Sequence, residues 1–203
     1  MSTYGTMQSR IADDIARTDL TSQIRTAILN AIVYYSVERF WFNQGVATAA
    51  TVDAQQNYDL PSDFIAADSL RITVNSSVYD LFPRTKQYID QLTVTASHEG
   101  QPSDYAIYAE DFWLWPIPDA VYTLTLAYHK KFAVLSASAD TNAWMVEAEQ
   151  LIRNRAEWEL YGTLLRDIAM ANACKSMELE ALANLKNMTG RQVASGTITP
   201  QVW

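Results

Sequence analysis

The stretch VYTLTLAYH, residues 121–129, decides the fold class of this chain. Its large apolar side chains alternate with smaller or polar ones, which is the period of a strand with one face in a core. One face carries Tyr122, Leu124, Leu126 and Tyr128, and the other carries Val121, Thr123, Thr125 and His129. We therefore expect a half-buried strand whose tyrosine and leucine face lies toward the core.

Two shorter strands precede this one, over residues 105–108 and 112–115. Glu110-Asp111 links the two, and Pro116-Ile117-Pro118-Asp119 leads on to residues 121–129, so the pattern predicts a three-stranded antiparallel meander. The run from Phe112 to Trp115 is apolar on both faces. Either both faces are covered within the domain, which we favour, or one is an aromatic subunit contact.

Further strands are predicted upstream. Residues 46–52 alternate in the same way, and residues 70–74 lead through Asn75-Ser76-Ser77 into residues 78–82, which is typical of a hairpin. Thr85 is placed to cap a short helix that contains Tyr88, Ile89 and Leu92.

Helical periods flank this β region. Met7, Ile11 and Ile15 recur every four residues within residues 6–17. A second helix, capped at Asp19, Thr21 or Ser22, is expected to run to about Phe40. Its main stripe is Ile24, Ala27, Ile28, Ala31 and Tyr35, and Leu29, Ile32, Val33, Tyr34 and Val37 widen that stripe almost around the helix. Such a helix must be covered on more than one side, which favours an assembly. The candidate subunit contacts are Ile32, Tyr34, Val37 and Trp41.

The last third of the chain is also helical. Asp140-Thr141-Asn142 can cap a long helix to about Asp167, with a break expected near residues 169–172 and a second helix ending at Gly190. The first stripe is Met145, Ala148, Ile152, Ala156, Leu160, Leu164 and Ile168, and the second is Met177, Ala181, Leu185 and Met188.

These patterns predict an α+β fold that is mainly helical. The terminal helices are expected to pack as a bundle, with an antiparallel β domain inserted between them and an extended C-terminal tail. We expect N-terminal helices over residues 1–44, the β-rich domain over 45–139, C-terminal helices over 140–189 and the tail over 190–203.

Composition excludes several classes of protein. The acidic residues are spread along the chain rather than collected into a tail, and the net charge of −8 disfavours tight reading of nucleic acid. Cys174 is the single cysteine, so neither an intrachain disulfide nor a thiolate metal cluster can form. No apolar run is long enough for a bilayer and the start lacks the regions of a signal peptide, so we expect a soluble protein that is made in the cytoplasm.

The titratable residues do not form a catalytic pattern. Glu110–Asp111, Asp13–Asp14 and Glu147–Glu149 are neighbours whose side chains diverge, and His98 and His129 are too far apart to pair. We expect no enzyme activity, cofactor or metal. The alternative is a small cell-wall hydrolase with Glu110 or Asp111 as the acid, which would need a second carboxylate facing it across a cleft.

The order of elements and several phrases resemble the head-to-tail adaptor family of tailed bacteriophages. The phrases are Glu38-Arg39-Phe40-Trp41-Phe42-Asn43, Tyr58-Asp59-Leu60-Pro61-Ser62-Asp63-Phe64, Gly100-Gln101-Pro102-Ser103-Asp104-Tyr105, Leu114-Trp115-Pro116-Ile117-Pro118-Asp119 and Asp140-Thr141-Asn142-Ala143-Trp144. Each phrase suits a turn or an element boundary of a scaffold, and none is a catalytic signature.

The resemblance implies a structural subunit of the virion neck. Such a protein docks beneath the portal as a ring, usually a dodecamer, extends the channel for DNA without sequence-specific binding, and presents a surface to a tail or nozzle protein. It also implies a C-terminal extension that reaches along the partner. We expect residues 190–203 to have that role, because this segment cannot bury enough surface to order itself, and its expected binding residues are Val193, Ile198, Pro200, Val202 and Trp203. A tail-completion or stopper protein lower in the neck is the nearest alternative. The acidity could line the channel or could simply maintain solubility.

Overall fold

The computed structural model describes residues 2–95 and 98–193, and the chain forms an α+β fold. It divides into two compact units: a helical unit, Met1–Asn43 with Phe132–Trp203, and a sheet unit, Gln44–Lys131. Residues 132–139, expected with the β domain, group with the helices because Phe132 and Leu135 pack into the helical core. Four of the predicted tail-binding residues lie outside the described residues: Ile198, Pro200, Val202 and Trp203.

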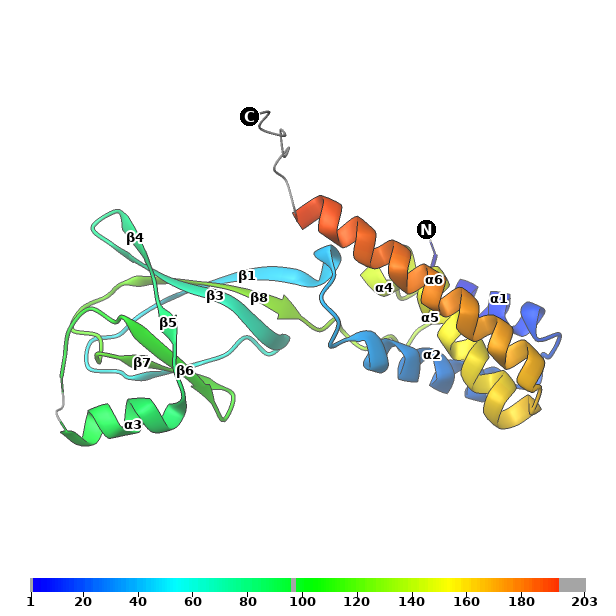
Figure 1. Ribbon diagram of the computed structural model, residues 1–203, viewed down its shortest axis with the longest axis horizontal. Coiled ribbons are helices and arrows are strands. Elements are labelled where there is room, and N and C mark those ends of the chain that lie inside the picture. Colours follow the sequence, from blue (N-terminus) through cyan, green and yellow to red (C-terminus); the bar gives the residue numbers. More distant parts are fainter. Residues whose placement is uncertain (1, 96–97, 194–203) are drawn as a thin grey trace, which may run out of the picture. The chain divides into compact units, whose positions relative to one another are not determined.

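The helical unit contains five α-helices and two short helical turns in its described part (Figure 1). They are α1 (Tyr4–Asp14), α2 (Thr21–Tyr35), the 3-10 turn η1 (Trp41–Asn43), α4 (Ala143–Val146), α5 (Glu149–Glu159), the π-helical turn η2 (Leu160–Leu165) and α6 (Ile168–Val193). α1 and α2 contact each other and both contact α5, while α6 packs along α5.

α1 begins earlier than residue 6 because Thr3 and Thr6 form a capping box. The Thr6 N–H donates to Thr3 Oγ1 over 3.2 Å, and the Thr3 N–H donates to Thr6 Oγ1 over 2.7 Å. This exchange satisfies two N-terminal amides that the helix itself leaves unpaired. The predicted stripe is confirmed, since Met7, Ile11 and Ile15 are buried.

The stripe of α2 is confirmed, but both of its predicted ends are wrong. Every residue of the main stripe is buried, yet the helix is capped by Leu20 without a side-chain hydrogen bond, because Asp19 is paired with Arg17. It ends at Tyr35 rather than Phe40. Asn43 stabilises the turn that follows, since its side chain accepts a hydrogen bond from the Phe40 N–H and donates one to the Glu38 carbonyl.

The C-terminal helices differ from prediction in their breaks. Asn142 caps only the short α4, and α5 continues into η2, which ends at Arg166 with a left-handed φ of 54°. The main break therefore falls before residues 169–172, and Asp167 caps α6 by accepting from the Met170 N–H. The prediction that Gly190 ends this helix is wrong. α6 runs on to Val193, since a glycine weakens a helix by about 1 kcal/mol without necessarily ending it.

The helical core combines side chains from both ends of the sequence. Phe40, Phe42, Phe132 and Trp144 form an aromatic cluster in which Phe42 stacks on Phe40 and meets Trp144 edge to face. The largest fully buried aliphatic residues around it include Met7, Ile11, Ile24 and Ile28. Burial of such side chains supplies the main stabilisation of the unit.

In its described residues, 44–95 and 98–131, the sheet unit contains two four-stranded sheets and one helix (Figure 1). Its elements are β1 (Gln44–Ala50), β2 (Asn57–Asp59), β3 (Phe64–Val74), β4 (Ser77–Asp80), β5 (Phe82–Pro83), α3 (Lys86–Thr95), β6 (Asp104–Tyr108), β7 (Asp111–Trp115) and β8 (Thr123–Lys130). One sheet has the order β1-β8-β3-β4 and the other β2-β7-β6-β5.

Two local predictions in this unit are confirmed. β3 and β4 form a hairpin in which Val74 pairs with Ser77, and Asn75 and Ser76 both have the positive φ that a tight two-residue turn requires. The Thr85 side chain accepts a hydrogen bond from the Tyr88 N–H at the start of α3.

The predicted three-stranded meander is wrong. β6 and β7 are a hairpin, but β8 pairs with β1 and β3 in the other sheet. The chain is held on that sheet by Thr51, whose N–H donates to the Tyr122 carbonyl while its hydroxyl accepts from the Tyr122 N–H. The unit is also not wholly antiparallel, because β5 pairs with β6 in parallel.

The predicted core face of β8 is confirmed. Leu124, Leu126 and Tyr128 are buried and share one cluster with side chains from both sheets, among them Leu70, Ile72, Tyr105, Phe112 and Leu114. Core positions therefore account for Phe112 and Leu114, whereas Trp113 and Trp115 are partly exposed. His129, on the opposite face of β8, is also buried, and its Nδ1 lies 3.0 Å from an Asp68 carboxylate oxygen.

Candidate functional site

The C-terminal end of α2 and the turn that follows it carry exposed apolar side chains. Val33 is 70% exposed, Tyr34 54% and Val37 72%, although the opposite face of the same helix is fully buried. Two of these, Tyr34 and Val37, are predicted subunit contacts. The other two predicted contacts, Ile32 and Trp41, are partly buried and pack against the helical core. The surface that remains available at this place is Val33, Tyr34 and Val37, which we call the α2 face.

A cation stack borders the α2 face. The Arg155 guanidinium lies 3.9 Å from the centre of the Tyr34 ring and 4.3 Å from that of the Trp158 ring, and the Lys175 ammonium lies 5.4 Å from the same tryptophan ring. Each stacked cation is held in place by the quadrupole of the ring. The sequence offered no signal for this arrangement beyond the Arg155–Trp158 spacing, because its members come from three helices.

Glu178 anchors the stack from inside the unit. Its side chain is fully buried, and its carboxylate accepts from the Tyr35 hydroxyl, from Lys175 over 3.0 Å and from Arg155 over 3.4 Å. Burial, and then the hydrogen bond to Glu178, raise the pKa of Tyr35 above its ordinary range. This one carboxylate ties α2, α5 and α6 together, so it holds the α2 face in a fixed geometry.

α6 presents a second apolar surface. Met170, Met177 and Met188 are each 43–45% exposed, and their spacing places them on the same side of the helix. Methionine side chains are flexible and polarizable, which suits an adaptable contact. Val193, a predicted partner-binding residue, ends this helix and is 56% exposed.

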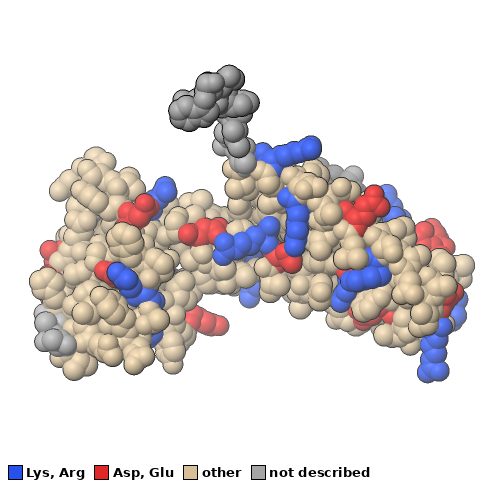
Figure 2. Space-filling model, in the orientation of Figure 1, with Lys and Arg blue, Asp and Glu red and all other residues tan. Residues whose placement is uncertain are grey.

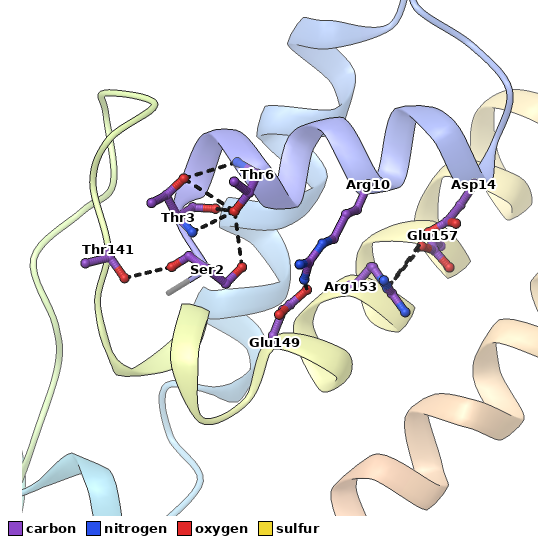
Figure 3. A network of polar contacts seen from close by, with 9 residues as sticks. All are labelled: Ser2, Thr3, Thr6, Arg10, Asp14, Thr141, Glu149, Arg153 and Glu157. Atoms are coloured by element: carbon purple, nitrogen blue, oxygen red, sulfur yellow. Dashed lines mark hydrogen bonds and ion pairs between the residues drawn. The ribbon is translucent and has the colours of Figure 1, made fainter.

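A polar network ties the two ends of the helical unit's sequence together (Figure 3). The Thr141 hydroxyl donates to the Ser2 carbonyl over 3.0 Å, and Arg10 on α1 forms an ion pair with Glu149 on α5. At the far end of α1, Asp14 lies beside Arg153 and Glu157 of α5. These contacts position α1 on α5.

The acidic residues of the rival hydrolase hypothesis occupy a turn. Ala109 and Glu110 both have positive φ between β6 and β7, and the Asp111 carboxylate accepts from the Asn57 amide over 3.0 Å. A cavity of about 190 Å³ between the two sheets has Asp59 as the one acidic residue of its lining. The geometry there is that of a hairpin turn and an apolar core gap, rather than of two carboxylates facing a substrate.

The remaining chemistry-bearing residues are dispersed. Burial raises the pKa of the Cys174 thiol to about 11, which makes it a poor nucleophile. Within residues 2–95 and 98–193, no three histidine, cysteine or acidic side chains are arranged to hold a metal ion. The described helices likewise include none with the length and apolarity to cross a bilayer.

Charge is distributed unequally between the units. The sequence from Gln44 to Lys131 has 11 acidic and five basic residues, a net charge of −6, so the rest of the chain accounts for only −2. On the face drawn in Figure 2, side chains of both signs are interspersed over the helical unit. The acidity of the chain is therefore a property of the sheet unit.

Exposed apolar side chains beside buried polar anchors are typical of a protein that contacts partners through its surface. The chain belongs to the SU10 adaptor protein family, which it matches over residues 2–201. This is a family of phage head-to-tail adaptors, so the expected resemblance is confirmed, and the family implies a structural rather than an enzymatic role. A search of curated proteins finds no match.

Proposed function

We propose that this protein is the head-to-tail adaptor that docks on the portal of a tailed phage as a ring, in the virion neck. The ring extends the DNA channel and provides the surface on which the tail or nozzle protein assembles. Family membership supports the structural role, and the α2 face supports docking by the helical unit.

The α2 face is the single observation that carries the proposal. Val33, Tyr34 and Val37 are exposed and contribute little to the core of their own unit, yet all three lie within five residues at the end of α2 and in the turn after it. Burying such side chains in an interface contributes about 25 cal/mol for each Å² of apolar surface removed from water. A ring repeats each contact around its axis, so modest individual contacts add up to stable docking.

Size-exclusion chromatography with light scattering tests docking. We expect the purified protein to associate weakly by itself and to co-elute with assembled portal as a larger complex of fixed stoichiometry. Separate elution at every mixing ratio would refute portal docking.

The tail is the second part of the proposal. Residues 191–203 include Val193, Ile198, Pro200, Val202 and Trp203, which we propose bind the portal or a neighbouring subunit. Deleting residues 191–203 should leave the two units folded and weaken docking. Unchanged affinity of the truncated protein for the portal would contradict this role.

A stopper or tail-completion protein lower in the neck is the second candidate function. It shares the surfaces described above, since an exposed apolar helix face fits any ring contact. The two candidates differ in their first partner, because a stopper would bind a preformed portal–adaptor complex and not the portal alone. The net charge of −6 in the sheet unit suits a channel wall that does not hold DNA, and it suits solubility equally well.

A further inference from the structure

A buried carboxyl lies where α1, α5, η2 and α6 meet. The Glu157 side chain is 7% exposed, and the Cys174 thiol lies 3.7 Å from its Oε2. Arg153 Nε is 3.7 Å from Glu157 Oε1 and 3.9 Å from Asp14 Oδ2, which is beyond hydrogen-bond length. Among the described residues, neither Arg153 Nε nor Glu157 Oε1 has a hydrogen-bond partner.

The groups around Glu157 leave it short of positive charge. Asp14 faces it from α1, Arg153 from α5 and Cys174 from α6, while Tyr161 of η2 donates its hydroxyl to the Asp14 carbonyl over 3.2 Å. The Arg153 guanidinium thus lies near both the Asp14 and the Glu157 carboxylates without forming a close hydrogen bond to either (Figure 3). A buried charge that is not well paired is costly, so one carboxyl is better protonated.

We propose that Glu157 holds a proton through which it bonds to Asp14 and latches the last turn of α1 to α5, and that losing this proton loosens that end of the helical unit. A protonated Glu157 can donate a hydrogen bond to the Asp14 carboxylate, whereas two ionised carboxylates repel each other. The inference concerns a conformational device within the unit and does not depend on portal docking.

Glu157 should lose this proton near neutral pH. Burial raises the pKa of Glu157 from 4.5 to about 7, and Asp14 contributes to the same shift. Between pH 4.5 and about pH 7, Glu157 holds a proton in the folded chain that it has lost in the unfolded chain. The proton therefore stabilises the folded state most below pH 4.5, and this contribution is lost as the pH rises through about 7.

The latch also restrains an irregular part of the backbone. Glu157 lies three residues before the π-helical turn η2, which ends at Arg166 in the left-handed region. π-helical turns are rare within helices and are frequently found at functional sites. Release of the Asp14 end of α1 would also release Tyr161, the residue of η2 that is bonded to it.

Hydrogen exchange of the full chain, measured by mass spectrometry at pH 6 and pH 8, tests the latch. Glu157→Gln keeps the shape of the protonated side chain, and exposed Glu180→Gln is the matched loss of one charge. Relative to Glu157→Gln, the unmodified protein should exchange its α1 amides at nearly the same rate at pH 6 and about tenfold faster at pH 8. Amides of β3 and β8 should not change, and Glu180→Gln should behave like the unmodified protein. If the ratio of α1 exchange rates between the unmodified protein and Glu157→Gln were the same at pH 6 and pH 8, the proposal would be overturned.

Two further measurements cover a variant that folds poorly. Asp14→Asn removes the neighbouring charge and should shrink the pH dependence of α1 exchange in a chain that retains Glu157. A ¹³C NMR titration of the Glu157 carboxyl in the unmodified protein should have its midpoint near 7. A midpoint near 4.5, the ordinary value, would overturn the proposal whatever the variants do.

Discussion

The Tyr35 hydroxyl of α2 donates a hydrogen bond to the buried carboxylate of Glu178 on α6. These two residues are far apart in the sequence, and their bond is a buried polar link between the N-terminal and C-terminal helices. Because Arg155 and Lys175 also bind Glu178, the same carboxylate orders the cation stack beside the α2 face.

Glu178→Gln should destabilise the helical unit strongly. The variant keeps the shape of the side chain but leaves Arg155 without its buried counter-charge, a loss of about 3–5 kcal/mol when one partner of a buried pair is removed. Urea unfolding followed by far-UV circular dichroism measures the effect. Glu180→Gln, which removes an exposed carboxylate from the same helix, should change stability by less than about 0.5 kcal/mol. Equal effects of the two substitutions would mean that Glu178 is not an anchor.

Paired aspartates on the α2 face should abolish docking while sparing the fold. Val33→Asp with Val37→Asp places two charges where we propose an apolar contact, and burying them without partners is costly. We expect portal affinity to fall at least about tenfold, as measured by biolayer interferometry. Val134→Asp, at a valine that is 80% exposed elsewhere in the helical unit, is the control and should dock normally. Normal docking of the double variant would exclude the α2 face.

The core that the two sheets share can be tested through β8. Leu124→Ala removes a side chain that is 1% exposed between the sheets and should cost about 2–5 kcal/mol through lost burial and a residual cavity. Val121→Ala, at a valine that is 73% exposed just before the same strand, should be nearly neutral. Thermal unfolding of both variants compares the two positions. A neutral Leu124→Ala would show that the strand does not bury this face.

In the turn between β3 and β4, one substitution should stabilise the protein rather than destabilise it. Ser76 holds a left-handed φ of 67°, which costs an L-residue roughly 1–2 kcal/mol and glycine much less. Ser76→Gly should therefore raise the melting temperature. Ser77→Gly, one residue later and inside β4, should lower it, because glycine loses more conformational entropy in a strand. A stabilising Ser77→Gly would contradict the assigned register.

Local patterns in the sequence predicted local structure well. The stripe of α2, the face of β8 and the Asn75-Ser76 turn all follow from side-chain period or turn chemistry, which a short stretch of sequence contains in full. Where an element ends is set by neighbours, as Asn43 shows by holding the turn after α2. The prediction of a helix to Phe40 was wrong for that reason.

Non-local pairings were not predictable. β8 follows β7 in the chain but pairs with β1 and β3, and the alternating pattern of residues 121–129 is the same in either sheet. The network around Glu178 joins three helices, so no single stretch of sequence signals it. The same holds for Glu157, whose burial depends on α1 and α6 packing against α5.

An image of the assembled neck by electron cryomicroscopy, with this chain labelled by an antibody fragment, tests the proposed role most directly. We predict labelled density in a ring directly beneath the portal and in contact with it. Labelled density lower in the neck, separated from the portal by another ring, would contradict the adaptor role and favour the stopper.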